Sequence, residues 1–455
     1  MFFSRINLSS VLCLIAFSSM ILTVCSLQAQ SIDSLHLDGV VYVQLKPGAS
    51  FDLVAYDSSN LILNQLIDVY EILEISQPFA GINDELDRSF RFDFASIAQI
   101  DNLLLQLQNH PELVYAEKSP LFRTNFIPDD LLGSQWHLPK IEAEKAWDLQ
   151  RGNDDIVVAV VDNAVRMTHE DLSSILWINQ TEANGLPGVD DDLNGYVDDV
   201  HGFDVADRDA DPSPPDSLDD FDSFSHGTHV AGIAAAATDN QLGGASIGFG
   251  ISMMSVKCTP SSESGNVLTN AYDGIVYAMR SGADVINMSF GSASNTYLTL
   301  GNILTAAHQQ DIMLVTAAGN ANTDTEFYPA AHPDVLAVAA TNQSDRKPSF
   351  SNFGGWIDVA APGQQIYAPL AGSDQSYGSL SGTSMAAPLV AGLCGLMRSQ
   401  DATQTPDQLK TQLVNACENI DANHPEFAGQ MGAGRINAFW AVGGTATNVV
   451  PDTDL

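Results

Sequence analysis

The stretch Ser381-Gly382-Thr383-Ser384-Met385-Ala386-Ala387-Pro388 places a serine among small residues, and an apolar run at 389–393 follows it. This pattern predicts that Ser384 lies in the first turn of a buried helix. Backbone N–H groups at a helix start have no partner within the helix, and the helix dipole is positive there. Both features stabilise an oxyanion, so Ser384 is a candidate nucleophile, although most serines in such turns only cap helices or form turns.

Short apolar runs alternate with helical patterns from about residue 130 to 443. Such runs are typical of strands buried on both faces of a parallel sheet. The expected strands are residues 156–161, 253–257, 285–288, 312–316 and 335–339, and the expected helices are residues 230–237, 268–279, 298–308 and 389–397. The alternation predicts an α/β fold, with helices on both faces of an open, mostly parallel sheet.

A smaller pattern precedes this domain. Residues 40–45 and 114–117 have strand character and residues 97–109 have helical spacing, which predicts a small α+β unit. The segment 119–133 contains prolines and a glycine and is typical of an exposed linker. We therefore expect a signal peptide at 1–29, the α+β unit with its linker at 30–127, the α/β domain at 128–445, and a short polar tail at 446–455.

The charge balance excludes some classes of function. The chain has 18 Lys and Arg against 56 Asp and Glu, a net charge of −38, so it offers no basic patch for nucleic acid. Arg5 followed by an apolar segment and a small residue, Ala29, predicts export, and a permanent membrane anchor is the alternative. Beyond the signal, the chain retains Cys258, Cys394 and Cys417, whose wide spacing matches neither a disulfide framework nor a zinc motif.

Four polar residues follow the strands or begin the helices of the predicted sheet. Asp162 closes one strand, His226 begins an Ala-rich helix, Asn320 follows another strand, and Ser384 begins the last helix. In an open α/β sheet such positions converge on one crevice. Ser384 would be the nucleophile and His226 its base, with Asp162 orienting the imidazole. Asn320 would donate its side-chain amide to the tetrahedral oxyanion.

The chain resembles a subtilisin-type serine protease over about residues 130–443. The matching motifs are His226-Gly227-Thr228-His229-Val230-Ala231-Gly232, Ala317-Ala318-Gly319-Asn320 and Gly382-Thr383-Ser384-Met385-Ala386-Ala387-Pro388. The chain order Asp, His, Ser is also that of subtilisin, whereas the order in α/β-hydrolase esterases differs. The resemblance implies a monomeric secreted endopeptidase, extracellular or periplasmic, that acts on polypeptides. It also implies that residues 31–120 are a prodomain, which assists folding, inhibits the enzyme within the same chain, and is removed by self-cleavage.

One position departs from the family's pattern. The aspartate is usually followed by Thr-Gly or Ser-Gly, and here Asn163-Ala164 follows Asp162. This departure is the only hint of the alternative, a noncatalytic relative that uses the same fold as a binding or scaffold protein. Because all four chemical groups are present, we expect activity.

The resemblance also implies a substrate cleft in which the peptide lies as an added strand. Ser289, Phe290 and Gly291 would form one edge, and Ser264, Gly265 and Asn266 the other. Phe327 occupies the position where many relatives have glycine at the base of the main specificity pocket. It would shorten the pocket and favour small or medium apolar side chains at P1, the substrate residue before the cleaved bond, unless it is a core residue that points elsewhere.

Calcium is the expected cofactor, at three clusters that could instead be solvated acidic loops. Asp190, Asp192 and Asn194 alternate before a glycine, with Asp199 nearby, as in calcium loops. The run that contains Asp204 and Asp209 resembles a calcium loop of some relatives. The positions of Asp171 and Asn240 match ligands of the family's tight calcium site.

Overall fold

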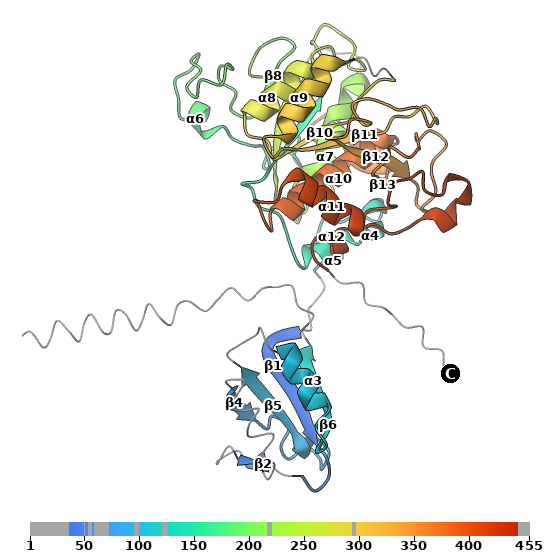
Figure 1. The fold of residues 1–455 in the computed structure, drawn as a ribbon. Coiled ribbons are helices and arrows are strands. Elements are labelled where there is room, and N and C mark those ends of the chain that lie inside the picture. The colour runs from blue at the N-terminus through green and yellow to red at the C-terminus, as the bar shows by residue number, and fades with distance from the viewer. Residues whose placement is uncertain are drawn as a thin grey trace, which may run out of the picture. The chain divides into compact units, whose positions relative to one another are not determined.

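The computed structural model of this 455-residue chain forms two compact units, Met1–Thr124 and Asn125–Leu455, each described here by itself (Figure 1). The boundary falls within the segment predicted to be a linker. The residues described are 36–49, 51–52, 57–58, 72–94, 100–120, 126–215, 221–293 and 297–444. The predicted signal peptide and polar tail lie outside them. None of the helices in these ranges combines the length and the apolarity that a membrane crossing requires.

The first unit contains a four-stranded antiparallel sheet in the order β4-β5-β1-β6. Its elements are β1 (His36–Leu45), β2 (Phe51–Asp52), β3 (Asp57–Ser58), β4 (Ile72–Ser76), η1 (Leu86–Arg88), β5 (Ser89–Phe94), α3 (Ile100–Gln108) and β6 (Leu113–Pro120). Alternate residues of β1, including Val41 and Val43, pack with Phe90 and Phe92 of β5 and with Leu107 of α3. This period of two is what a half-buried strand requires.

The second unit is built on a seven-stranded parallel sheet in the order β13-β12-β11-β10-β7-β9-β8. The strands are β7 (Val157–Asp162), β8 (Gly202–Asp204), β9 (Ser252–Lys257), β10 (Val285–Met288), β11 (Met313–Ala317), β12 (Leu336–Thr341) and β13 (Val359–Pro362), and β14 (Ile366–Pro369) and β15 (Tyr377–Leu380) form a separate hairpin. The predicted α/β fold with a mostly parallel sheet is confirmed.

Helices cover both faces of this sheet (Figure 1). They are α4 (His137–Lys140), α5 (Ala143–Trp147), α6 (Gln180–Ala183), η3 (Phe221–Phe224), α7 (Ser225–Ala235), α8 (Ala271–Arg280), α9 (Leu298–His308), α10 (Thr383–Arg398), α11 (Pro406–Asn415), η4 (Asp421–Asn423), η5 (Pro425–Phe427) and α12 (Ala438–Ala441). On β7, Val158 and Val160 pack with α7 and α10, whereas Val157 and Val161 pack with α8 and α9. The strand is therefore apolar on both faces, which explains its continuous apolar run.

Two helices begin elsewhere than their apolar patterns suggested. α8 begins at Ala271 rather than Leu268, because the N–H groups of Thr269 and Asn270 both donate to the carbonyl of Cys258 instead of beginning a helix. α10 begins at Thr383, so the helix includes Pro388 and carries Ser384 in its first turn, as predicted.

The strand order positions the site. From β7 the chain first builds β8 and β9 on one side and then β10 to β13 on the other, so β7 lies where the order reverses. Ligands of open α/β sheets bind at this switch point, beyond the carboxyl ends of the strands. Asp162 is the last residue of β7.

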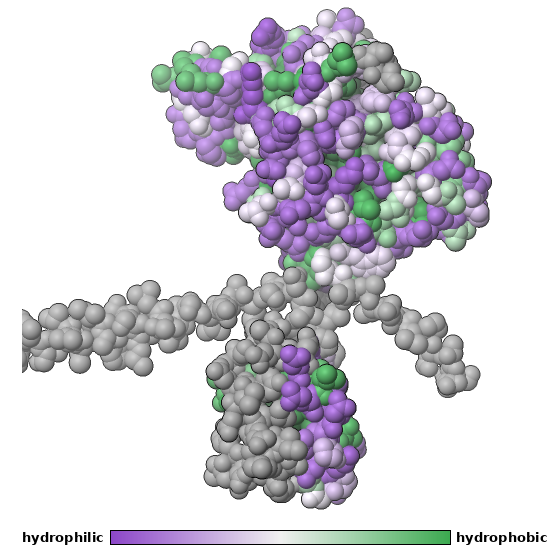
Figure 2. Space-filling model, viewed as in Figure 1, coloured by the Kyte–Doolittle hydropathy of each residue, from purple (hydrophilic) through white to green (hydrophobic). Residues whose placement is uncertain are grey.

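The surface of the second unit reflects the acidic composition. Hydrophilic residues cover most of the visible face, and apolar residues gather at the end of the segment that carries α6 (Figure 2, upper left). Leu186 and Leu193 are among the exposed apolar residues of this segment. The described part of the second unit thus combines an acidic surface with an ordinary apolar core, although some carboxylates, such as Asp162 and Asp171, are buried.

Candidate active site

The predicted acid and base are in direct contact. His226 lies in the first turn of α7, and its Nδ1 is 2.8 Å from Asp162 Oδ1. Asp162 is buried, with its side chain 1% exposed, and the N–H of Asn163 donates to the same Oδ1 over 2.7 Å. Burial alone would lower the pKa of His226, but the charge and hydrogen bond of Asp162 outweigh it and the pKa is raised. The imidazole is therefore a good proton acceptor held in one orientation.

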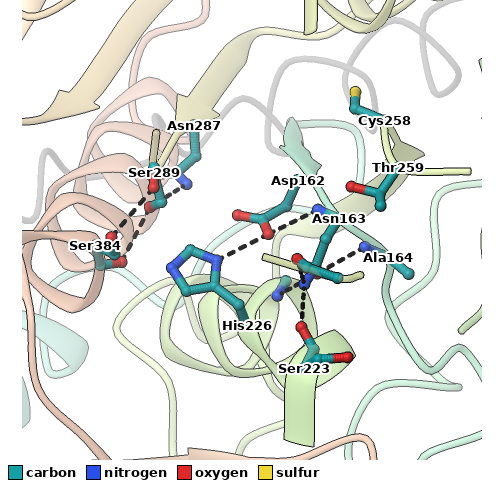
Figure 3. Close-up of polar contacts among 12 residues, drawn as sticks. Asp162, Asn163, Ala164, Ser223, His226, Cys258, Thr259, Asn287, Ser289 and Ser384 are labelled. Carbon is teal, nitrogen blue, oxygen red and sulfur yellow. Dashed lines mark hydrogen bonds and ion pairs between the residues drawn. The ribbon is translucent and has the colours of Figure 1, made fainter. Parts of the chain in front are cut away.

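Ser384 lies on the other side of this imidazole (Figure 3). Its Oγ donates to the carbonyl oxygen of Ser289 over 3.1 Å, and Ser289 Oγ donates back to the carbonyl oxygen of Ser384 over 3.0 Å. The second bond has a physical cause. Pro388 has no N–H to donate to the Ser384 carbonyl one turn back, so this carbonyl needs another donor. The hydroxyl of Ser289 is this donor, and its hydrogen bond connects the predicted cleft edge to the first turn of α10.

Asn320 lies just beyond β11, and Thr383 holds the oxygen end of its side-chain amide. Its Oδ1 accepts from the N–H of Thr383 over 2.9 Å and from the Thr383 hydroxyl over 3.0 Å. The amide nitrogen therefore faces away from Thr383, toward Gly382, where an added Cβ would lie 3.4 Å from it. The amide nitrogen of Asn320 thus lies beside the start of α10, in whose first turn Ser384 stands.

The two predicted cleft edges border a common pocket of about 460 Å³. Asn266 comes from one edge and Phe290 and Gly291 from the other, and the rest of the lining is mainly apolar, including Val267, Leu268, Tyr272 and Leu300. The backbone of Ser292, next to Gly291, exchanges two hydrogen bonds with that of Tyr328. These two hydrogen bonds hold the backbone around Ser292 against that around Tyr328, and both residues line the pocket.

Phe327 lies against both Gly291 and Gly319. A Cβ on Gly291 would be 2.5 Å from Cε1 of Phe327, and a Cβ on Gly319 would be 3.1 Å from its Cδ1. The ring is thus packed between the cleft edge and the residue before Asn320, and does not point into the core. It is half-buried.

Of the predicted calcium ligands, Asp190 and Asp192 are brought together with Glu182 of α6. One ligand oxygen from each of these three residues lies within 4.8 Å of the others. Sequence analysis missed Glu182 because it precedes the alternating motif. Asp199 accepts hydrogen bonds from Asn194 and Tyr277, and its burial raises its pKa to about 6.

Asp171 and Asn240 are also in contact, and a third residue joins them. Asn240 Nδ2 donates to Asp171 over 2.9 Å, while the N–H of Asn240 donates to Asp130 over 3.0 Å. Burial raises the pKa of Asp171 to about 6 and raises that of Asp130. Oδ1 of Asp130 is buried and lacks a partner among the described residues. Asp130 was missed because it lies far away in sequence, in the predicted linker.

Asp204 and Asp209 do not form a comparable cluster. Asp204 is buried in an ion pair with Lys257, whose Nζ lies 2.6 Å from its Oδ2, and its Oδ1 accepts from the N–H groups of Ala206 and Asp207. Lys257 therefore occupies the position at which a cation would contact Asp204, so Asp204 is not free to hold calcium.

Comparison with known proteins extends these observations. The Subtilase family model matches residues 153–434. The chain is 34% identical to "Thermophilic serine proteinase" of Bacillus sp. (strain AK1), over 77% of this chain and 78% of that protein. It is 33% identical to "Halolysin-like extracellular serine protease Nep" of Natrialba magadii, over 75% of this chain and 58% of that protein. A solved protease structure from Pseudoalteromonas arctica aligns with a TM-score of 0.56 and 28% identity, over 69% of this chain and 98% of that one.

Proposed function

Because the chain belongs to the subtilase family of serine endopeptidases, we propose that it cleaves polypeptides with Ser384, His226 and Asp162 through an acyl-enzyme. The observation that carries the proposal is the 2.8 Å contact between His226 and Asp162, with Ser384 on the other side of the imidazole. The scaffold alternative loses its main support, because the side chain of Asn163 does not displace either member of this pair.

The first chemical step transfers a proton from Ser384 Oγ to Nε2 of His226 while Oγ attacks the peptide carbonyl carbon. For this, the hydroxyl gives up its hydrogen bond to the Ser289 carbonyl. The imidazolium that forms is stabilised by Asp162 and then protonates the leaving amine. Water, activated by the same imidazole, releases the acyl group and restores Ser384.

The negative charge on the carbonyl oxygen would be held by Asn320 Nδ2 and by the N–H of Ser384. Thr383 supports this role because it binds Oδ1 of Asn320 and so fixes which end of the amide faces the substrate. A donor that is already oriented costs little reorganisation when the charge develops.

Phe327 would determine which P1 side chains bind. Its ring fills the space between Gly291 and Gly319, where a P1 side chain would extend from a peptide lying along the cleft edge. The enzyme would therefore prefer small or medium apolar P1 residues. The separate apolar pocket bordered by Val267, Tyr272 and Leu300 would accept another apolar substrate side chain.

Calcium would be held by Asp130, Asp171 and Asn240, and also by Glu182, Asp190 and Asp192. The first set fits a hard cation because it offers oxygen ligands and includes a buried carboxylate oxygen without a partner. Bound calcium would neutralise these buried carboxylates and tie the segment around Asp130 to the residues near Asp171 and Asn240.

The α+β unit would be an inhibitory prodomain, removed by the enzyme itself after export by the signal at 1–29. The compactness of the unit supports its being a domain of its own, and the similarity to an extracellular protease of Natrialba magadii supports export. The mature enzyme would act outside the cytoplasm as a monomer.

The experiment that tests the proposed function compares hydrolysis of an unfolded protein by wild type, Ser384→Ala and Ser381→Ala. Ser381 is the matched control, because it is an exposed serine of the same segment. We expect hydrolysis by wild type and Ser381→Ala, and none by Ser384→Ala. Equal hydrolysis by all three, or none by folded wild type, would contradict the proposal.

A further inference from the structure

We propose that Asn163 is a positioning residue that fixes the helix turn of His226 against Asp162 and against the cleft edge at Gly265. It occupies the position at which the chain departs from the family's usual pattern. The inference rests on the proposed protease function, and it assigns a role to a residue that neither touches the substrate nor takes part in proton transfer.

The side chain of Asn163 is fully buried and uses all of its hydrogen-bonding groups. Its Oδ1 accepts from the N–H of Ala164 over 2.7 Å and from the N–H of Gly227 over 2.9 Å. Its Nδ2 donates to the carbonyl of Ser223 over 3.0 Å and to that of Gly265 over 2.8 Å (Figure 3). One amide therefore joins the end of β7, the junction of η3 and α7, and the cleft edge.

The hydrogen bond between Gly227 and Asn163 holds the helix turn that carries the base, His226. Gly227 follows His226, and a Cβ on it would lie 2.3 Å from the carbonyl oxygen of Ala164 and 2.9 Å from Cβ of Asp162. The backbone of α7 thus packs directly on the end of β7. Asn163 holds this approach in two ways, because its N–H binds the carboxylate of Asp162 and its side chain binds the turn of His226.

The hydrogen bond between Asn163 and Gly265 holds the cleft edge formed by Ser264, Gly265 and Asn266. A Cβ on Gly265 would lie 2.2 Å from the carbonyl oxygen of Ser223, so these two backbones also touch. Nδ2 of Asn163 donates to the carbonyls of both Ser223 and Gly265, and so joins the two backbones where they touch. Loss of this donor would move the edge away from α7 and from the catalytic groups.

The test uses two variants and two probes. Asn163→Ala removes every side-chain contact, whereas Asn163→Asp keeps the acceptor for Gly227 and replaces the donor to Ser223 and Gly265 with an oxygen. The rate of labelling by a small fluorophosphonate reports the reactivity of Ser384 alone. The hydrolysis of a peptide that spans the cleft reports, in addition, how well the cleft edge binds substrate. Asn437→Ala is the matched control, because Asn437 is a fully buried asparagine that caps the distant helix α12. All rates are taken at the alkaline plateau, where His226 is neutral.

We expect Asn163→Ala to slow fluorophosphonate labelling on the order of 100-fold, the loss that a misplacement of about 1 Å produces. In Asn163→Asp, labelling should slow by less than about tenfold while KM for the long peptide rises by about tenfold or more. Asn437→Ala should lower the melting temperature and leave both rates within about twofold of wild type.

Labelling and peptide hydrolysis that stay within twofold in folded Asn163→Ala would overturn the positioning role and leave the protease function standing. If Asn163→Ala does not fold, Asn163→Asp decides: an unchanged KM for the long peptide overturns the role of the edge contact. Folded wild type that neither reacts nor hydrolyses would instead overturn the proposed function and this inference with it.

Discussion

Replacement of Phe327 by alanine should change the P1 preference of the enzyme. The ring lies against Gly291 and Gly319, with Cε1 only 2.5 Å from where a Cβ on Gly291 would be. Removing it leaves a space of about one phenyl ring beside the cleft edge. Burial of a phenylalanine side chain is worth about 1.5–3 kcal/mol, and each 1.36 kcal/mol is a factor of ten in rate. The ratio of kcat/KM for P1 Phe over P1 Ala should therefore rise by about 10- to 160-fold.

The assay is a matched series of peptides that differ only in P1, namely Ala, Leu and Phe. Wild type should favour Ala or Leu, and Phe327→Ala should favour Phe. Leu186→Ala is a suitable control, because Leu186 is an exposed leucine outside the cleft and its loss should leave the ranking unchanged. A wild type that already prefers Phe at P1, or a variant with the wild-type ranking, would refute the role of Phe327 as the pocket base.

Three further predictions concern oxyanion stabilisation, calcium and pH. Asn320→Ala should lower kcat on the order of 100- to 1000-fold with little change in KM, the loss known for the equivalent donor in subtilisin, and a change below tenfold would contradict its role. Excess chelator should lower the melting temperature by about 5 °C or more. Asp171→Ala should reduce this effect, because it removes one of the two proposed sites, and the exposed-site control Asp401→Ala should keep it in full; equal melting temperatures with and without chelator would exclude calcium. Burial lowers the pKa of His137 to about 3 and that of His229 to about 4, so their contribution to stability is complete above about pH 6.5 and is lost as pH falls toward these values. At pH 5 each should cost about 2 kcal/mol of unfolding free energy, measured by urea titration of inactive Ser384→Ala at pH 8 and pH 5, and identical midpoints at constant slope would contradict the assignment.

The architecture could be predicted from the sequence because its signals are local. Continuous apolar runs such as 156–161 identify strands buried on both faces, and the spacing of Leu298 to His308 identifies a helix. The motif predicted the start of α10 near Ser384, although a proline such as Pro388 is disfavoured inside a helix. Its place inside the helix depends on Ser289, which satisfies the freed carbonyl of Ser384 from a distant strand end.

The candidate site was predictable only in part. Motifs around Asp162 and His226 indicated an acid and a base, and the structure places the two side chains within hydrogen-bonding distance of each other. Asp130 and Glu182 could not be assigned, because their partners are distant in sequence and a single acid in a linker or short helix carries no pattern. The positioning role that we propose for Asn163 was equally hidden. Its departure from the family pattern suggested a defect, and the proposal depends on the four contacts of its side-chain amide.

The mass of the protein after reaction with a fluorophosphonate shows directly whether Ser384 is the activated nucleophile. We expect one adduct on wild type, on the peptide that contains Ser384, and none on Ser384→Ala or His226→Ala. We also expect that only the inactive variants retain the α+β unit. A folded wild type that keeps this unit and carries no adduct, or an adduct on a different serine, would contradict the account.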